Sequence, residues 1–166
     1  MDILTIAVTS TVISALVSSL IAGWFNLRSK KDEYANTYYK MILERRIAAY
    51  EEVQQLIVAI KVSVVDIDQR PYHLAFSGGN DFSTVYKLSL EMMSNALWLT
   101  DELFELTRQL NFLMFEATGP EEGFVEFGKR NYKTVAELRT KLERTLAKDM
   151  LVLHNIPVFL KAKKHN

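Results

Sequence analysis

The residues best suited to chemistry in this chain are three histidines, His73, His154 and His165. There is no cysteine, which excludes thiolate nucleophiles, disulfides and cysteine zinc sites. His73 and His154 have no second ligand at helical spacing and no H-E-x-x-H occurs, so we expect neither a metal nor another cofactor. A G-x-S-x-G nucleophile elbow and a phosphate-binding P-loop are also missing from the sequence. These observations predict a protein that is not an enzyme.

Cations near two of the histidines favour anion binding instead. Ser77-Gly78-Gly79-Asn80 precedes an expected helix, whose first N–H groups and dipole attract negative charge. The candidate residues for binding an anion or a nucleotide are Arg70, His73, Ser77, Gly78, Gly79, Asn80, His154, Lys161, Lys163 and Lys164. The alternative is a solvated basic tail and an ordinary glycine turn.

Composition and charge limit the class of protein. The 166 residues suffice for one ordinary domain, and 49% of them are apolar, which supports a hydrophobic core. Twenty Lys and Arg balance 20 Asp and Glu, so no overall field attracts duplex DNA. The charges are unevenly placed, because only Asp2 precedes Arg28.

The uncharged run from Ile3 to Leu27 is the most informative segment. It is longer than the ~20 residues that a helix needs to cross a bilayer, so we expect a transmembrane helix over residues 1–27. Trp24 and Phe25 lie where an interfacial aromatic belt is expected. The alternatives are a buried core helix and a cleaved signal peptide, but a signal peptide carries its cations before the apolar core.

Three cations, Arg28, Lys30 and Lys31, follow the run and set the expected orientation. The positive-inside rule places them in the cytoplasm, with the amino terminus outside and the carboxyl terminus cytoplasmic. The expected organisation is a single span at 1–27, a cytosolic helical domain at 28–160 and a loose basic tail at 161–166.

Small residues cover one half of the expected span. This small face consists of Ala7, Ser10, Thr11, Ser14, Ala15, Ser18, Ser19, Ala22 and Gly23. Rows of small residues let helix backbones approach closely in lipid, so we expect a homo-oligomer formed through this face. A repeat of four residues exceeds 3.6, which favours a right-handed crossing. The alternatives are a monomeric anchor and a ring whose hydroxyl groups line a pore.

The remainder of the chain predicts an all-α fold, an antiparallel bundle of about three long helices. The first helix is expected from Asp32 to about Val65, the second from about Phe82 to Ala117, and the third to about His154, with Pro157 as its stop. Expected core positions on the first are Ile42, Ala49, Val53, Leu56 and Ile60, with Ile47, Tyr50, Ile57 and Val64 beside them; those on the second are Met92, Ala96, Leu99, Leu103, Leu106, Leu110 and Leu113; those on the third are Val135, Leu138, Leu142, Leu146, Met150 and Leu153.

Three long helices also predict where the candidate residues meet. In this arrangement the first helix leads away from the membrane, the second returns toward it and the third leads away again. The loop from Arg70 to Asp81 and the carboxyl-terminal tail are therefore expected to share the membrane-distal end. All three histidines would gather there.

The expected layout, with an amino-terminal span and a helical cytosolic domain, resembles small membrane-anchored CRISPR-associated effectors of bacterial antiviral defence, of the HEPN-like or cyclic-oligoadenylate-sensing types. KDMLVLH, Lys148–His154, is similar to the arginine-then-histidine pattern of HEPN ribonucleases, with lysine in the arginine's place. Lysine lacks the planar fork that grips phosphate, so we do not expect RNA cleavage.

The resemblance implies an oligomeric protein of the bacterial inner membrane. Such a protein perturbs the membrane or forms a pore when its cytosolic domain receives a nucleotide second messenger or a protein partner. The alternatives are a membrane adaptor that recruits a cytosolic protein, and a degenerate HEPN-type ribonuclease.

Overall fold

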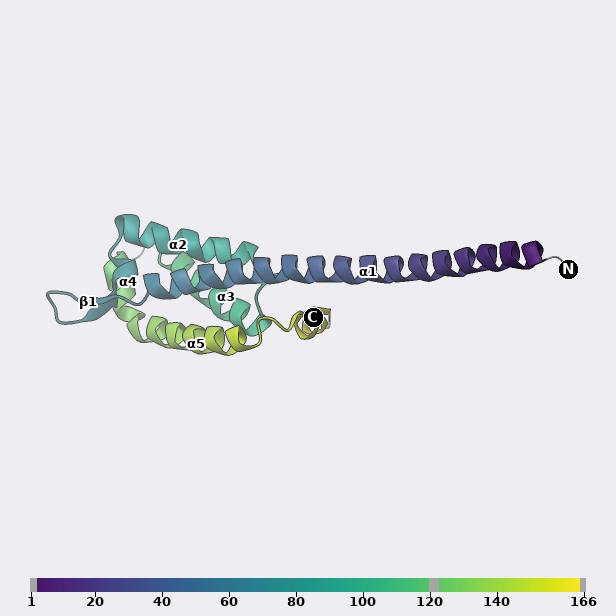
Figure 1. Ribbon diagram of the computed structural model, residues 1–166. Coiled ribbons are helices and arrows are strands. Elements are labelled where there is room, and N and C mark those ends of the chain that lie inside the picture. The colour runs from purple at the N-terminus through teal and green to yellow at the C-terminus, as the bar shows by residue number, and fades with distance from the viewer. Residues whose placement is uncertain (1–2, 120–122, 165–166) are drawn as a thin grey trace. The chain divides into compact units, whose positions relative to one another are not determined.

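The computed structural model describes residues 3–119 and 123–164, and the side chains of residues 18–119 and 123–163. Helices dominate this part of the chain, which confirms the all-α class (Figure 1). The elements are α1 (Ile3–Ala59), β1 (Ser63–Val65), β2 (Pro71–His73), the 3-10 helix η1 (Leu74–Phe76), α2 (Gly79–Ser94), α3 (Asp101–Glu116), α4 (Phe124–Arg130), α5 (Tyr132–Leu151) and α6 (Ile156–Lys164).

Helix α1 runs without interruption for 57 residues, so the expected span and the first expected helix of the domain form one element. The chain divides into two compact units, Met1–Met41 and Ile42–Asn166, and α1 contributes to both. Within the described part of the chain, no helix has an apolar stretch long enough to span a membrane.

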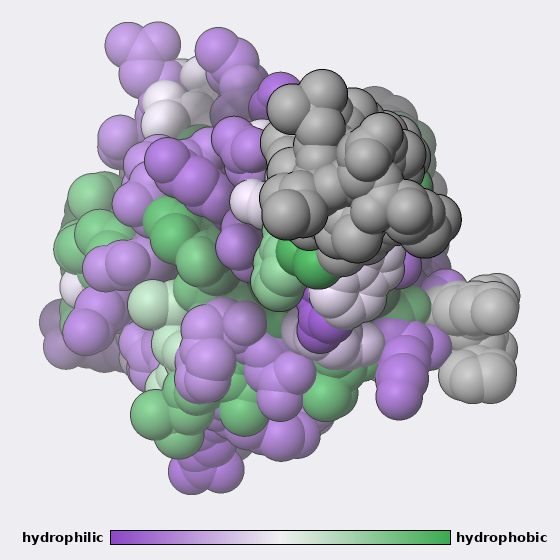
Figure 2. All heavy atoms as spheres, turned by 45° about the vertical axis from the view of Figure 1, so that its right-hand side comes forward, coloured by the Kyte–Doolittle hydropathy of each residue, from purple (hydrophilic) through white to green (hydrophobic). Residues whose placement is uncertain are grey.

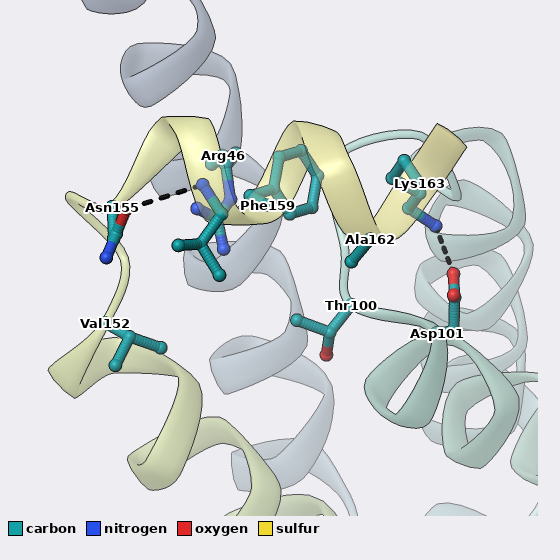
Figure 3. Close-up of a pocket in the computed structure, with 9 residues that line it drawn as sticks. Arg46, Thr100, Asp101, Val152, Asn155, Phe159, Ala162 and Lys163 are labelled. Atoms are coloured by element: carbon teal, nitrogen blue, oxygen red, sulfur yellow. Dashed lines mark hydrogen bonds and ion pairs between the residues drawn. The ribbon is translucent and has the colours of Figure 1, made fainter. Parts of the chain in front are cut away.

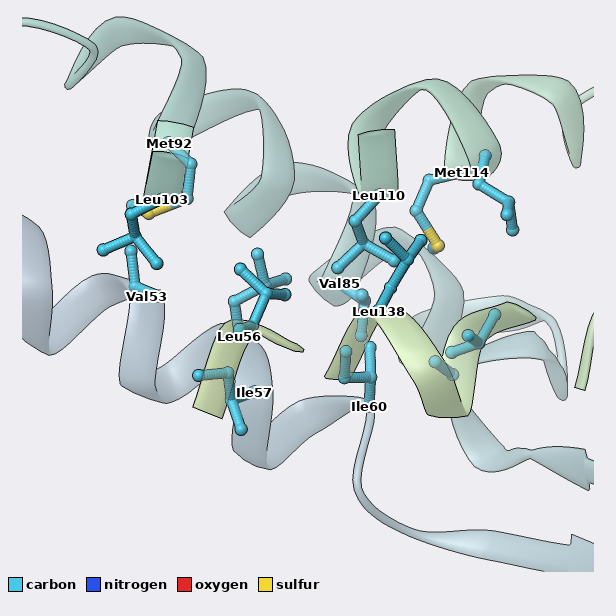
Figure 4. Packing of buried hydrophobic residues seen from close by; sticks show 14 of the residues in the cluster. Val53, Leu56, Ile57, Ile60, Val85, Met92, Leu103, Leu110, Met114 and Leu138 are labelled. Atoms are coloured by element: carbon cyan, nitrogen blue, oxygen red, sulfur yellow. The ribbon is translucent and has the colours of Figure 1, made fainter. Parts of the chain in front are cut away.

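The core of the second unit is built around the last part of α1. The predicted stripe of Ile42, Ala49, Val53, Leu56 and Ile60 is buried throughout, and Tyr50 and Ile57 are buried beside it. Figure 4 shows Val53, Leu56 and Ile60 meeting side chains of α2, α3 and α5. Each fully buried aliphatic side chain contributes about 1.5–3 kcal/mol, so this stripe fixes α1 in the bundle. Ile47 and Met150 were predicted as core residues and are exposed instead.

The second predicted helix is wrong, because the chain reverses within it. Helix α2 ends at Ser94 and α3 begins at Asp101. The Asn111 amide donates to the Ser89 hydroxyl at 3.0 Å, so the two helices lie side by side as an antiparallel pair. The Thr100 side chain accepts from the Leu103 N–H and caps α3. The seam predicted for one long helix therefore spans two shorter ones.

A short hairpin replaces the predicted end of the first helix. Ser63–Val65 pairs with Pro71–His73 in antiparallel register, with Val64 opposite Tyr72. β-Branched valines favour extended backbone, which explains why α1 ends at Ala59 rather than near Val65. Pro71 begins the second strand, a position where proline is tolerated.

The third predicted helix is divided, and the tail is helical. Helices α4 and α5 are separated at Asn131, and α5 ends at Leu151. Pro157 does not end the helical part of the chain but lies in the first turn of α6. Backbone N–H groups of a first turn have no hydrogen-bond partner within the helix, so proline is tolerated there. The prediction of a loose tail from residue 161 is wrong as far as Lys164, since α6 continues to that residue.

Candidate functional site

A pocket lies beneath α6 in the second unit. Its volume is about 140 Å³. The lining residues are Arg46, Thr100, Asp101, Val152, Asn155, Val158, Phe159, Ala162 and Lys163 (Figure 3). They come from α1, the start of α3, the segment after α5 and α6. An apolar cavity near 150 Å³ can hold a benzene-sized molecule, so the space suits a small ligand.

Arg46 supplies a buried cation to this pocket. Its side chain is only 1% exposed. Nη1 donates to the Leu153 carbonyl oxygen at 2.8 Å, and Nη2 donates to the Tyr50 hydroxyl at 3.2 Å. The guanidinium carbon lies 3.9 Å from the centroid of the Phe159 ring, which is a close cation–π contact. Among the described residues, the Arg46 Nε has no hydrogen-bond partner, and an unpaired buried donor costs about 1–3 kcal/mol.

Asp149 balances the charge of Arg46 through a shared neighbour. The Tyr50 hydroxyl donates to Asp149 Oδ2 at 3.2 Å, and the Thr100 hydroxyl donates to the same oxygen. Burial raises the pKa of Tyr50, so its hydroxyl keeps its proton at neutral pH. These contacts join α1, α5 and the start of α3 into one buried polar network.

Lys163 and Asp101 form a second balanced pair at the pocket. Lys163 Nζ donates to Asp101 Oδ1 and, at 3.2 Å, to the Ala96 carbonyl oxygen (Figure 3). The two contacts connect α6 to the first residue of α3 and to the turn before that helix. The pocket and its immediate network therefore contain two cations and two carboxylates.

Sequence reasoning missed Arg46, although a signal was present. Arg46 lies four residues after Ile42 and four before Tyr50, so it falls on the stripe that the sequence placed in the core. A charged residue at a core-facing position requires a partner. That partner could not be found from local sequence, since Asp149 and Leu153 lie about 100 residues further along the chain.

The structure divides the predicted anion site between two ends of the second unit. Arg70, His73, Ser77, Gly78, Gly79 and Asn80 belong to the hairpin, η1 and the start of α2, whereas His154, Lys161, Lys163 and Lys164 lie at or within α6. His73 stacks on Tyr132, the first residue of α5, and Leu153 follows the end of that helix. Twenty residues at 1.5 Å place these ends about 30 Å apart.

The prediction that the two groups share one end is therefore wrong (Figure 1). The unexpected reversal between α2 and α3 adds one more pass through the bundle. The side chain of Lys164 and the whole of His165 lie outside the described residues.

The hairpin end is occupied by its own ion pairs. Lys129 Nζ lies 2.5 Å from Asp66, 2.9 Å from Asp68 and 2.7 Å from Glu126. Arg70 donates to Asp68 and to Glu126, both at 2.7 Å. Three carboxylates lie close enough together to hold a metal ion, but the Lys129 ammonium already sits among them. The cluster is therefore best explained as a structural charge network.

A carboxylate of the protein itself, that of Asp81, lies at the glycine turn. The Ser77 hydroxyl donates to Asp81 Oδ2 at 3.0 Å, and Asp81 lies in the first turn of α2. Gly78 has φ 88° and Gly79 has φ 58°, conformations that favour glycine, so the geometry of the turn explains both glycines without a ligand. An external anion at this end would meet several carboxylates.

The His73 ring is buried, and each of its two nitrogens contacts a protein oxygen. It is fully buried, with Nε2 at 3.3 Å from the Tyr132 carbonyl oxygen and Nδ1 at 3.2 Å from the Ser63 hydroxyl. Burial lowers its pKa, so the ring is neutral at pH 7. His154 is exposed, and Lys148, its partner in the HEPN-like segment, pairs with Glu102 at 3.1 Å. The two histidines do not come together.

The small face is described only in part. Ser18, Ser19, Ala22 and Gly23 are exposed on α1, while the side chains of Ala7, Ser10, Thr11, Ser14 and Ala15 lie outside the described residues. The same helix exposes five large apolar side chains by 52–74%: Leu20, Ile21, Trp24, Phe25 and Leu27. Contiguous exposed apolar side chains of this kind mark interaction surfaces in many proteins.

Comparison with known proteins found no matching family model, no matching curated protein and no matching solved structure.

Proposed function

We propose that the protein is a non-enzymatic, single-pass membrane protein that self-associates through the small face of its span. In this proposal it acts as a membrane-perturbing or pore-forming defence effector of the bacterial inner membrane. The second unit, residues 42–166, receives the trigger. The observation that carries the proposal is the uncharged run from Ile3 to Leu27, followed at once by three cations.

The physical support begins with the exposed apolar side chains of α1. Burying a large apolar side chain is worth about 1.5–3 kcal/mol, so leaving five of them in water is unfavourable. A helix satisfies its own backbone hydrogen bonds, which a bilayer interior requires. Arg28 lies 5.8 Å from the centroid of the Trp24 ring, a pairing suited to the interface between hydrocarbon and headgroups.

Self-association follows from the distribution of sizes around the same helix. Large side chains such as Leu20 and Ile21 suit contact with lipid, while Ser18 and Ala22 allow a second backbone to approach. The hydroxyl groups can then donate across the helix pair. A row of small residues would have little use in a monomeric anchor.

The polar groups of the second unit support a binding role rather than catalysis. His73 is held by Ser63 and Tyr132, and Asp149 by Tyr50 and Thr100. The Ser63 hydroxyl lies beside His73, but the second ring nitrogen of His73 faces the Tyr132 carbonyl oxygen rather than a carboxylate, so these described residues do not form a Ser-His-Asp triad. Lys148, the cation of the HEPN-like segment, faces a carboxylate, which does not favour phosphate binding.

A membrane adaptor is the second candidate function, and one observation favours it. Phe112 and Phe115 on α3 are 58% and 59% exposed, and aromatic side chains often anchor protein partners. Figure 2 shows hydrophobic residues interrupting a largely hydrophilic surface. In this alternative the span only tethers the domain, and a cytosolic protein docks on it.

Membrane attachment and orientation test the proposal directly. The full chain should remain with membranes after an alkaline carbonate wash, while a chain lacking residues 1–27 should be released. A fluorescent protein fused after Asn166 should fluoresce, and alkaline phosphatase at the same point should be inactive. Recovery of the full chain in the soluble fraction, or an active phosphatase fusion, would overturn the proposal.

A further inference from the structure

We infer that the pocket beneath α6 binds a small, uncharged, mostly apolar molecule with one hydrogen-bond acceptor, such as a ketone, ester or amide. This inference goes beyond membrane attachment, because every residue that carries it belongs to the second unit. It would hold for the effector and for the adaptor alike.

The size and wall of the pocket set the apolar part of the ligand. About 140 Å³ matches a single ring or a short branched chain. Val152, Val158, Phe159 and Ala162 form much of the lining. Figure 3 shows Val152, Phe159 and Ala162 around the same space as Arg46. Small-molecule sites typically combine such a wall with a few well-placed polar groups.

Arg46 Nε supplies the polar group. It is a buried donor without a hydrogen-bond partner on a side chain that lines the pocket. The Thr100 hydroxyl and Lys163 Nζ, which also line it, already donate to carboxylates. Nε has almost no accessible surface in this structure, so a ligand carbonyl oxygen would accept from it after a rotation of the Arg46 side chain toward the pocket. A hydrocarbon of the same shape would leave the donor unpaired.

Charge matching indicates that the ligand is neutral. Arg46 is linked through Tyr50 to Asp149, and Lys163 pairs with Asp101. An anionic ligand would add an unbalanced charge to a largely apolar space, which is costly. The same argument excludes a positively charged ligand.

Three probes of similar size separate these contributions. Acetophenone has the acceptor, α-methylstyrene replaces its oxygen with a CH₂ group, and benzoate carries a negative charge. We expect acetophenone to bind at least about tenfold more tightly than α-methylstyrene, because a hydrogen bond from a charged donor is involved. Benzoate should bind more weakly than acetophenone. Binding is measured on the full chain in lipid nanodiscs from the methyl NMR shifts of Val152 and Val158.

A matched pair of variants locates the binding. Ala162→Leu should fill the pocket and weaken acetophenone binding about tenfold or more, while Ala147→Leu, at an exposed position of α5, should leave it unchanged. Circular dichroism checks that both variants keep their helicity. Equal affinity for acetophenone and α-methylstyrene would overturn the role of Arg46. Preference for benzoate would overturn the ligand class, and unmoved methyl signals with all three probes would overturn the site.

Discussion

Close approach at single residues decides how tightly the second unit can pack. Gly128 in α4 lies against Phe76, so that a Cβ added to the glycine would meet the Phe76 Cβ at 2.6 Å. Phe76 is fully buried and lies 5.8 Å from the Phe127 ring, which leaves it little room to move. From the sequence, Gly128 is recognisable only as a weak helix former. Its close contact with Phe76 can be seen only in the folded structure.

Gly128→Ala should therefore destabilise the protein, although alanine favours a helix by about 1 kcal/mol. We expect a net loss of about 1–3 kcal/mol from overpacking, measured as the shift in the urea unfolding midpoint. Gly123→Ala is the control, because no atom of the described residues outside its chain neighbours lies within 4 Å of the added Cβ. Equal midpoints for the two variants would contradict the close contact.

For Arg46, burial could be predicted from the sequence, but its hydrogen-bond partners could not. The inward stripe of α1 was predictable because Ile42, Val53, Leu56 and Ile60 follow helical spacing and are all buried. The same spacing places Arg46 inside. Which groups neutralise it depends on contacts between distant segments, so the candidate site beneath α6 could not be predicted.

At the scale of elements, periodicity concealed a chain reversal. Met92, Leu99 and Leu103 keep steps of seven and four, although Met92 lies in α2 and Leu103 in α3. Both helices turn the same apolar side to the core, so the pattern continues through the turn. Thr100 followed by Asp101 and Glu102 was the available signal, since a capping threonine and acidic residues mark a helix start.

The link between the hairpin and α4 gives a pH prediction at the same scale. Hydrogen bonds from Lys129 lower the pKa of Asp66, Asp68 and Glu126. The unfolded chain therefore binds these protons at a higher pH than the folded protein does. The stabilisation is present above about pH 5, begins to decline near pH 4, where the unfolded carboxyl groups take up protons, and is lost as the pH falls through the lower pKa values of the folded protein.

Lys129→Met should remove part of this dependence. We expect its urea midpoint to change less than that of the wild type between about pH 6 and pH 3. Lys87→Met is the matched control, because Lys87 is exposed and pairs only at 3.8 Å with Glu91. If both variants lose stability with acid as steeply as the wild type, the Lys129 network does not stabilise the hairpin.

At the scale of the whole molecule, one additional pass of the chain changes which segments are neighbours. Three long helices would bring His73 and His154 together, whereas the extra reversal after α2 separates them along α5. The helical class follows from local periodicity and was therefore predictable. The grouping of candidate residues depends on the number of reversals, so the turn that was not predicted separates four of the ten candidate residues from the other six.

The proposed assembly rests on the small face and makes the last prediction. Ser18→Leu and Ala22→Leu keep the segment apolar but place a large side chain where a partner backbone would approach. Both should preserve membrane attachment and reduce the oligomer seen by cross-linking. Leu20→Ile, at a position outside the small face, should change neither property. Ser18→Ala should be nearly silent, because interhelical polar contacts in membranes average only about 0.6 kcal/mol.

The same variants distinguish the two candidate functions. If the oligomer perturbs the membrane, overexpression of the wild type should arrest growth, and Ser18→Leu and Ala22→Leu should relieve the arrest together with the oligomer. For an adaptor, binding of its partner should depend on Phe112 and Phe115 and survive both leucine variants, because the span then serves only as a tether. An oligomer and a growth arrest that both persist in the leucine variants would remove the small face from the assembly, since no close helix crossing accommodates leucine at both positions.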